Sequence, residues 1–151
     1  PRELQVALID IPNRNVIEDF SQGRLEIDTK INSPYDIKII AGERSYVVQM
    51  VEEILTDIPE KYSLSQNYPN PFNPITNINY SVPRSGSVTL SIYNIMGQRV
   101  TTLVSGTMKY GYHSVVWNGL DQSGRQVSSG VYFSELSARG FRQTKKMLLL
   151  K

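Results

Sequence analysis

Residues 88–104 read VTLSIYNIMGQRVTTLV, and this stretch decides the fold class. Every second residue is aliphatic from Val88 to Ile92, which is the period of two expected of a β-strand with one buried face. Met96-Gly97-Gln98 carries turn residues, and a second apolar-rich segment begins at Arg99. The stretch therefore predicts two strands joined by a tight turn.

The same texture extends outward on both sides, with turn signals at a spacing of roughly ten residues. Further strands are predicted at 78–82, 112–117, 131–138 and 141–150, with a loop at 106–111 and turns at Asn118-Gly119, Ser123-Gly124 and Arg139-Gly140. Six or seven short strands at this spacing predict an all-β fold, an antiparallel immunoglobulin-like β-sandwich.

Residues 67–74 read NYPNPFNP and precede the first of these strands. Because proline fixes φ and lacks a backbone donor, the segment is expected to be extended without being a central strand. Tyr68 and Phe72 are expected to lay their rings on an edge of the sandwich.

The first part of the chain has a different pattern. Residues 4–11 are almost continuously apolar, 16–17 and 25–27 are short strand candidates between turn clusters, and 35–40 alternate until Ala41-Gly42. Four short strands bury little core, so they are expected to be the end of a larger β-sandwich module. Residues 45–55 carry one apolar stripe at helical spacing, which predicts a helix used for packing.

The predicted organisation follows from these patterns. Residues 1–55 are the end of an upstream β module plus a short helix, 56–63 are a polar linker with Pro59, and 64–151 are the complete β-sandwich. The chain begins without Met, a basic segment or an apolar core, so we expect a piece of a longer protein whose signal peptide lies elsewhere.

The net charge changes sign at the same boundary, between residues 63 and 64. Residues 1–63 hold seven Lys/Arg and twelve Asp/Glu, a net −5, whereas residues 64–151 hold nine Lys/Arg and only Asp121 and Glu135, a net +7. A basic module favours anionic partners such as lipopolysaccharide, nucleic acid or an acidic protein channel, and the alternative is a solvated basic face without a partner. There is no cysteine, hence no disulfide framework, and no run approaches the roughly 18–20 apolar residues of a membrane span.

Candidate catalytic and metal-binding residues are few. His113 is the only histidine and lies mid-strand, where a partly buried strand residue is favoured over a catalytic base. Asp121 and Glu135 are a poor glycosidase pair, and Asn118, Asp121 and Ser123 echo a calcium loop that lacks its last ligand, so a turn is favoured. No phosphate-binding glycine motif is present. We expect no catalytic site, metal or cofactor in this segment.

Nucleic-acid binding is also disfavoured, although the second unit is basic and aromatic. Its tyrosines and Trp117 occupy strand positions that core packing explains, rather than an exposed stacking platform. We therefore expect no nucleic acid among its partners.

The second unit resembles a known family along its whole length. The signature runs in order through Leu64-Ser65-Gln66-Asn67-Tyr68-Pro69-Asn70-Pro71-Phe72-Asn73-Pro74, Ile92-Tyr93-Asn94-Ile95-Met96-Gly97-Gln98-Arg99-Val100, His113, Val116-Trp117-Asn118-Gly119, Asp121, Gly124, Ser129-Gly130-Val131-Tyr132 and Lys145-Lys146-Met147-Leu148-Leu149-Leu150-Lys151. This ordered set resembles the type A C-terminal sorting domains of the type IX secretion system. Upstream, Pro34-Tyr35-Asp36-Ile37-Lys38-Ile39-Ile40-Ala41-Gly42 resembles the final strand of the immunoglobulin-like modules that often precede them.

The resemblance implies a non-catalytic function. Such domains direct a secreted cargo from the periplasm through the outer membrane, where a translocon recognises them and a surface peptidase commonly removes them in the preceding linker, here 56–63. The cargo is then secreted or held at the cell surface, in some cases on anionic lipopolysaccharide. We hypothesise that the last strand with Lys145, Lys146 and Lys151, plus the turn at Gly130-Val131-Tyr132, forms the docking surface, because a terminal strand can pair at an edge.

Two other functions remain open. The signatures at 93–100 and 117–132 also resemble the immunoglobulin-like domain of flagellar hook-capping proteins, which is a structural assembly module. A carbohydrate-binding accessory module would instead need a planar row of exposed aromatic rings, with Tyr93, Tyr110, Tyr112 and Tyr132 as possible members.

Overall fold

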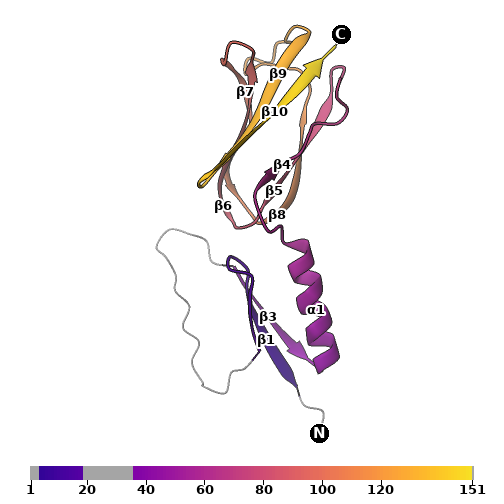
Figure 1. Ribbon diagram of the computed structural model, residues 1–151, viewed down its shortest axis with the longest axis vertical. Helices are drawn as coiled ribbons and strands as arrows, with labels where there is room; N and C mark the ends of the chain where they lie inside the picture. Colours follow the sequence, from indigo (N-terminus) through magenta and orange to yellow (C-terminus); the bar gives the residue numbers. More distant parts are fainter. Residues whose placement is uncertain (1–3, 19–35, 151) are drawn as a thin grey trace.

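The computed structural model describes residues 4–18 and 36–150, which form two units placed end to end (Figure 1). The N-terminal unit is a three-stranded sheet of order β2-β1-β3, made of Gln5–Asp10 (β1), Asn15–Ile17 (β2) and Ile37–Gly42 (β3). Helix α1, Arg44–Asp57, lies alongside β1 and β3. The predicted strand at 25–27 lies outside the described residues.

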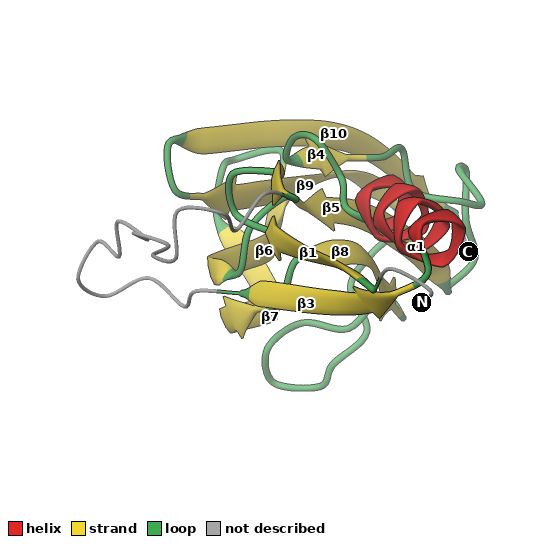
Figure 2. Ribbon diagram, turned by 90° about the horizontal axis from the view of Figure 1, so that it is seen from below, coloured by secondary structure: helices red, strands yellow, loops and turns green. Residues whose placement is uncertain are grey.

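The C-terminal unit is a sandwich of two antiparallel sheets, seen along the long axis in Figure 2. One sheet has the order β4-β5-β8, formed by Ser63–Leu64, Thr76–Val82 and Gly111–Trp117. The other has the order β10-β9-β6-β7, formed by Phe141–Leu149, Gly130–Ala138, Gly86–Asn94 and Arg99–Met108. The predicted all-β, immunoglobulin-like fold is confirmed.

One predicted boundary in this unit is wrong. Residues 106–108, expected in a loop, continue β7, because Gly106 pairs with Val88 and Met108 pairs with Gly86 of β6. Glycine was read as a loop signal, but this one has a φ of 145° within a paired strand. The cross-strand partner keeps the segment in the sheet despite the local signal.

The sandwich core is built from the inward-facing residues of both sheets. Ile78 and Val82 from one sheet meet Leu90, Ile92 and Leu136 from the other, all with no exposed surface. These residues are the alternate positions of their strands, so the period of two in the sequence places one side chain in every pair in the core. Trp117 and Phe72 are the largest side chains that are fully buried.

The N-terminal unit has a separate core between helix and sheet. Val47 and Val51 of α1 pack with Ala7, Ile9 and Ile11. The predicted helical stripe is thus a packing surface, and in the described part of this unit a helix rather than a second sheet covers the strands. No helix in the described residues is long and apolar enough to span a membrane.

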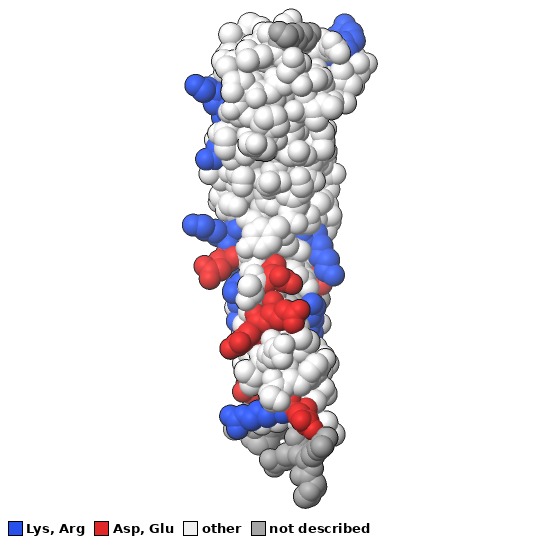
Figure 3. Space-filling view, turned by 90° about the vertical axis from the view of Figure 1, so that its right-hand side faces the viewer, with Lys and Arg blue, Asp and Glu red and all other residues white. Residues whose placement is uncertain are grey.

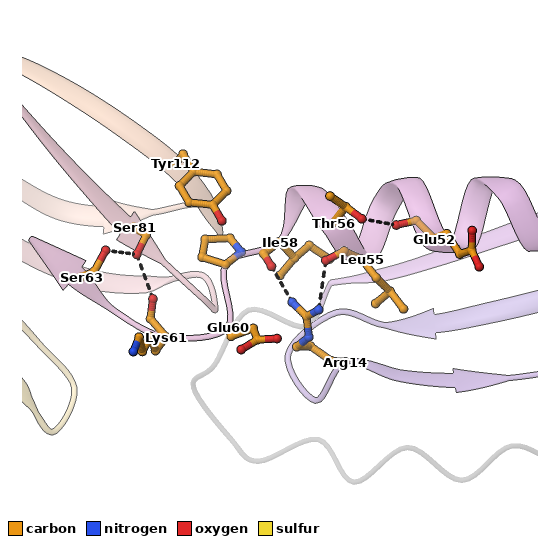
Figure 4. Close-up of a pocket in the computed structure, with 11 residues that line it drawn as sticks. Arg14, Glu52, Leu55, Thr56, Ile58, Glu60, Lys61, Ser63, Ser81 and Tyr112 are labelled. Carbon is orange, nitrogen blue, oxygen red and sulfur yellow. Dashed lines mark hydrogen bonds between the residues drawn. The ribbon is translucent and has the colours of Figure 1, made fainter. Parts of the chain in front are cut away.

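The junction between the units is more ordered than a polar linker would be. Thr56 and Asp57, expected in the linker, end α1, and Ile58 is buried in the N-terminal core. The Arg14 guanidinium donates to the carbonyls of Ile58 and, at 3.1 Å, Leu55 (Figure 4). The carbonyls at a helix C-terminus lack intrahelical hydrogen-bond partners, and Arg14 supplies donors to them. Its positive charge also interacts favourably with the negative end of the helix dipole.

A second contact joins the units on another side. Ser85 Oγ donates to Asp36 Oδ2 at 2.6 Å and accepts from the Tyr110 N–H at 3.2 Å. The Tyr110 ring packs on the N-terminal core. Two turns of the sandwich therefore contact the first unit. The segment that connects the two units, residues 58–62, is short.

Replacing Arg14 by alanine is expected to loosen the last turn of α1. Loss of two hydrogen bonds from a charged donor should cost about 1.5–3 kcal/mol of local stability. Hydrogen exchange of the amides of residues 54–57 should speed up accordingly, while the amides of β6 and β9 should be unchanged. Arg99→Ala removes an equally charged, exposed side chain and serves as the control. Unchanged exchange at 54–57 would show that the contacts do not hold the junction.

Candidate functional site

The candidate catalytic residues are engaged in structural contacts. His113 stacks on Tyr80, with ring centroids 5.2 Å apart, and its Nε2 lies 2.8 Å from the Lys109 carbonyl oxygen. Glu135 lies in the opposite sheet and faces Arg142 at 3.8 Å. Within residues 4–18 and 36–150, no cluster of three or more His, Asp or Glu side chains could hold a metal ion. The geometry assembles no acid–base pair around either residue.

Asp121 organises a tight loop after β8. Its Oδ1 accepts from the N–H groups of Ser123 and Arg125 at 2.8 and 3.0 Å, and its Oδ2 accepts from Arg125 Nε at 3.1 Å. The hydrogen bond from the Arg125 N–H is the main cause that lowers the pKa of the Asp121 carboxyl. Both carboxylate oxygens are thus used by the loop itself, and Gly124 completes it with a φ of 77°.

The proline-rich segment and the last strand form one structural element, which we call the clasp (residues 66–74 together with 146–150). The Phe72 N–H donates to Leu148 O at 3.0 Å, and the Leu150 N–H donates to Phe72 O at 2.9 Å. The Asn70 side chain accepts from the Leu148 N–H at 2.9 Å, and Gln66 Nε2 donates to Lys146 O at 2.7 Å. These hydrogen bonds therefore hold two segments side by side that are more than 70 residues apart in the chain.

The expectation that the Phe72 ring lies on an edge of the sandwich is wrong, and the Tyr68 ring is mostly exposed to solvent. Tyr68 is 79% exposed, but Phe72 is only 2% exposed and its ring lies 5.4 Å from that of Trp117. The Phe72 backbone pairs with β10, and the Phe72 side chain points from the sheet edge into the core. Asn67 is also buried, and its side chain donates to Pro69 O and Thr76 Oγ1 at 3.0 and 2.9 Å.

The clasp decides how much of the β10 edge can accept another strand. On the side of β10 that points away from β9, the Lys146 carbonyl, both backbone groups of Leu148 and the Leu150 N–H are bonded to residues 66–72. The outward backbone groups around Arg142 and Thr144, together with the Lys146 N–H, have no such partners in the described residues. Strand addition at the second half, as hypothesised, would require the clasp to open.

The residues predicted to dock separate onto different faces. Val131 and Lys146 lie on the outer face of the four-stranded sheet, but Lys145 lies on the opposite face because neighbouring strand residues alternate. Tyr132 is a core residue that contacts Trp117 and donates from its hydroxyl to Ser128 O at 2.7 Å. Gly130 begins β9, and Lys151 lies outside the described residues.

The outer face of this sheet carries a patch that the sequence alone did not group. Cross-strand pairing aligns Tyr93, Phe133 and Lys146 in one row and Val131 with Leu148 in the next. We call these five residues the distal face, because they are grouped near the C-terminal end of β10, which lies at the end of the sandwich away from the N-terminal unit (Figure 1). The alternation of residues along each strand predicts which side chains face outward. Which of them lie side by side depends on the register between the strands, which the sequence pattern does not give.

The distal face continues into a shallow groove. A groove of about 450 Å³ is lined by Tyr93, Ile95, Phe133 and Thr144, with the Glu135–Arg142 pair at one end. Ile95 and its neighbour Met96 form the tip of the β6–β7 turn. The sequence offered one signal for this tip, namely the large apolar Met96 inside the predicted turn with Ile95 directly before it.

The charge division of the sequence is also a division in space. Figure 3 shows acidic side chains around the junction and the N-terminal unit, and none on the visible part of the sandwich. Lys146 lies on the same outer face as the single described ion pair of that sheet, Arg142 with Glu135, whereas Lys145 lies on the opposite face. The sandwich therefore presents mainly cationic groups to a partner.

The aromatic residues do not form a planar carbohydrate platform. Tyr132 is buried in the core, Tyr110 packs on the N-terminal unit and Tyr93 is half-buried. Tyr112 is 71% exposed but lies on β8 of the other sheet. The four rings proposed for one row thus belong to separate environments.

Comparison with known proteins relates part of this chain to an immunoglobulin-like family. The family model of the FlgD Ig-like domain matches residues 76–140. These residues run from the start of β5 to the β9–β10 turn, so that the clasp and β10 lie outside the match. No curated protein matches the chain.

Three solved structures are similar to parts of this chain. FlgD from P. aeruginosa is 24% identical, with 50% of this chain and 59% of that chain covered and a TM-score of 0.38. Dimeric latent PorU from Porphyromonas gingivalis is 14% identical over 77% of this chain and 11% of that one, with a TM-score of 0.47. PorZ, a type-IX secretion component at the surface of Porphyromonas gingivalis, is 17% identical over 61% and 12%, with a TM-score of 0.40. The chain spans less than two thirds of each of them.

Proposed function

We propose that residues 64–151 are a non-catalytic sorting module that a type IX outer-membrane translocon recognises. The observation that supports this proposal best is the clasp. The segments on either side of the FlgD-like residues 76–140 pack on each other through backbone and side-chain hydrogen bonds. These flanking segments contain the two parts of the signature, Asn67–Pro74 and the lysine-flanked last strand, that an assembly domain of the FlgD type does not characteristically have.

The clasp also gives the module the rigidity that favours recognition by a partner. It ties β10 to the sandwich, so that the distal face is presented as one rigid surface rather than as a loose tail. A pre-organised surface loses little conformational entropy on binding. The net charge of +7 on residues 64–151 would attract an anionic partner, such as a negatively charged translocon surface or lipopolysaccharide.

The proposal includes removal of the module after export. The segment that a surface peptidase would cut, 56–63, holds the buried residues Ile58 and Pro59. An extended substrate segment must leave this packed position before it can enter a protease cleft. In this proposal the cargo upstream of the module ends as a secreted or cell-surface protein.

Export of a reporter tests the sorting function. The whole chain 1–151 is fused behind a signal peptide and a reporter, in hosts with and without a working type IX translocon. We expect the reporter outside the cell, in the medium or at the cell surface, only when the translocon works. Deleting the last strand is a poor test, because Met147 and Leu149 are core residues and the sandwich would unfold.

A double substitution, Val131→Ser with Lys146→Glu, instead probes the distal face in the folded protein. We expect at least a tenfold loss of export, which corresponds to about 1.4 kcal/mol of binding free energy. Arg139→Glu makes the same charge change at the other end of β9 and should export normally. Full export of the double variant would exclude the distal face as the recognised surface.

A structural assembly module is the second candidate, and the match of residues 76–140 to the FlgD Ig-like domain favours it. Retention of a folded reporter fusion in the periplasm of both hosts would support this function and contradict sorting. The same fusion therefore decides between the two.

A further inference from the structure

The tip of the β6–β7 turn exposes two large apolar side chains. Ile95 is 73% exposed and Met96 is 72% exposed. Turns of this kind usually carry Gly, Asn, Asp or Ser, which satisfy the backbone and face water. Side chains this exposed bury little surface within the chain, so they add little to the stability of the fold.

The backbone beneath these side chains is held rigidly by Asn94. Its Oδ1 accepts from the N–H groups of Met96 and Gln98, both at 3.0 Å, and its Nδ2 donates to Gln98 Oε1 at 2.8 Å. The Gly97 N–H donates to Asn94 O at 3.0 Å, and Gly97 has a φ of 74°, which a side chain would disfavour. The backbone that carries the apolar pair is thus held in one conformation, and that backbone loses little entropy on binding.

The surroundings of the tip indicate the chemistry of a partner. Ile95 forms one side of the groove whose floor includes Tyr93 and Phe133. Arg99 pairs with Tyr93 across β6 and β7, and Lys146 pairs with Phe133, so a cation stands on each side of the aromatic row. A partner that covers this area would therefore have apolar contacts at its centre and acidic groups at its rim.

A protein fits this surface better than a lipid surface does. A bilayer could take up Ile95 and Met96, but membrane affinity grows with the apolar area inserted and two side chains offer little. The groove of about 450 Å³ beside the tip is concave, and it can receive a protruding side chain of a protein. Methionine is also suited to a partner pocket of irregular shape.

We propose that Ile95 and Met96 are the hydrophobic anchor of the sorting module and insert into an apolar, acid-rimmed pocket of the protein that recognises it. This inference rests on the proposed sorting function, and it identifies two residues through which the module would bind the protein that recognises it. Anchors of this type commonly carry a large share of the binding energy of an interface.

The test uses the reporter fusion of the whole chain with Ile95→Ser and Met96→Ser, in the host with a working translocon. Serine is compatible with a turn, so thermal unfolding should match that of the parent chain. We expect at least a tenfold drop of reporter outside the cell, in the medium and at the cell surface together. The matched control, Tyr112→Ser with Val116→Ser, removes two residues that are 71% and 52% exposed on the other sheet, and should change export by less than twofold.

The outcomes separate the inference from the function on which it rests. If the parent fusion is not exported, the sorting function fails and the anchor fails with it. If the parent and the tip variant are both exported, the anchor alone is wrong. Two further results would also overturn it: flotation of the parent chain, but not the variant, with anionic phospholipid vesicles, or self-association in sedimentation that the variant abolishes.

Discussion

Substitution of Trp117 by alanine is expected to lower the free energy of unfolding of the C-terminal unit by about 3–5 kcal/mol. The side chain is 1% exposed, and its ring lies 5.4 Å from Phe72 and 5.2 Å from Tyr132. Its Nε1 also donates to Leu120 O at 3.0 Å, which holds the start of the following loop. The substitution removes apolar burial, leaves a cavity between the sheets and frees that carbonyl.

This loss would be a large part of the total stability, since domains of this size are stable by about 5–15 kcal/mol. Urea unfolding followed by far-UV circular dichroism measures it without the tryptophan signal, which the substitution deletes. Tyr112→Ala, on the same strand but exposed, should change the free energy by no more than about 0.5 kcal/mol. A loss below about 1 kcal/mol for Trp117→Ala would contradict the packing described above.

Replacing Phe72 by alanine should also cost about 3–5 kcal/mol, and should additionally release the clasp. The ring is the part of the proline-rich segment that is anchored in the core, whereas the neighbouring Tyr68 is exposed. Without the ring, the hydrogen bonds of Phe72 with Leu148 and Leu150 are expected to open in local fluctuations.

Hydrogen exchange distinguishes this local release from a uniform loss of stability. The amides of Phe72 and Leu150 should exchange faster than the global change explains, while those of Ile78 and Val115 in the paired strands β5 and β8 follow the global change. Tyr68→Ala, in the same segment, should leave both sets unchanged. Because Phe72 and Trp117 are in contact, the double substitution should be non-additive by about 0.5–3 kcal/mol. Strict additivity would indicate that the two rings do not share one packing site.

Several residues show why local patterns misplace side chains. Tyr132 was grouped with Gly130 and Val131 as a docking turn, but alternation sends its ring into the core, where it contacts Trp117. Lys145 and Lys146 are neighbours in sequence and lie on opposite faces for the same reason. In contrast, Val131 and Lys146 do share the distal face, and their role in recognition stays a prediction.

The amino-acid sequence by itself determined the positions of the strands, the tight turn at Gly97, the helix of the first unit and the charge division between the units. These features depend on the period of two or 3.6 and on the backbone preferences of Gly and Pro, which are local. Only the tertiary structure decided that Phe72 is buried, that residues 66–74 cover half of the β10 edge, and that Phe133 and Leu148 join the distal face. The physical reason is that these outcomes depend on contacts between segments far apart in the chain, whose register and closure no local pattern encodes.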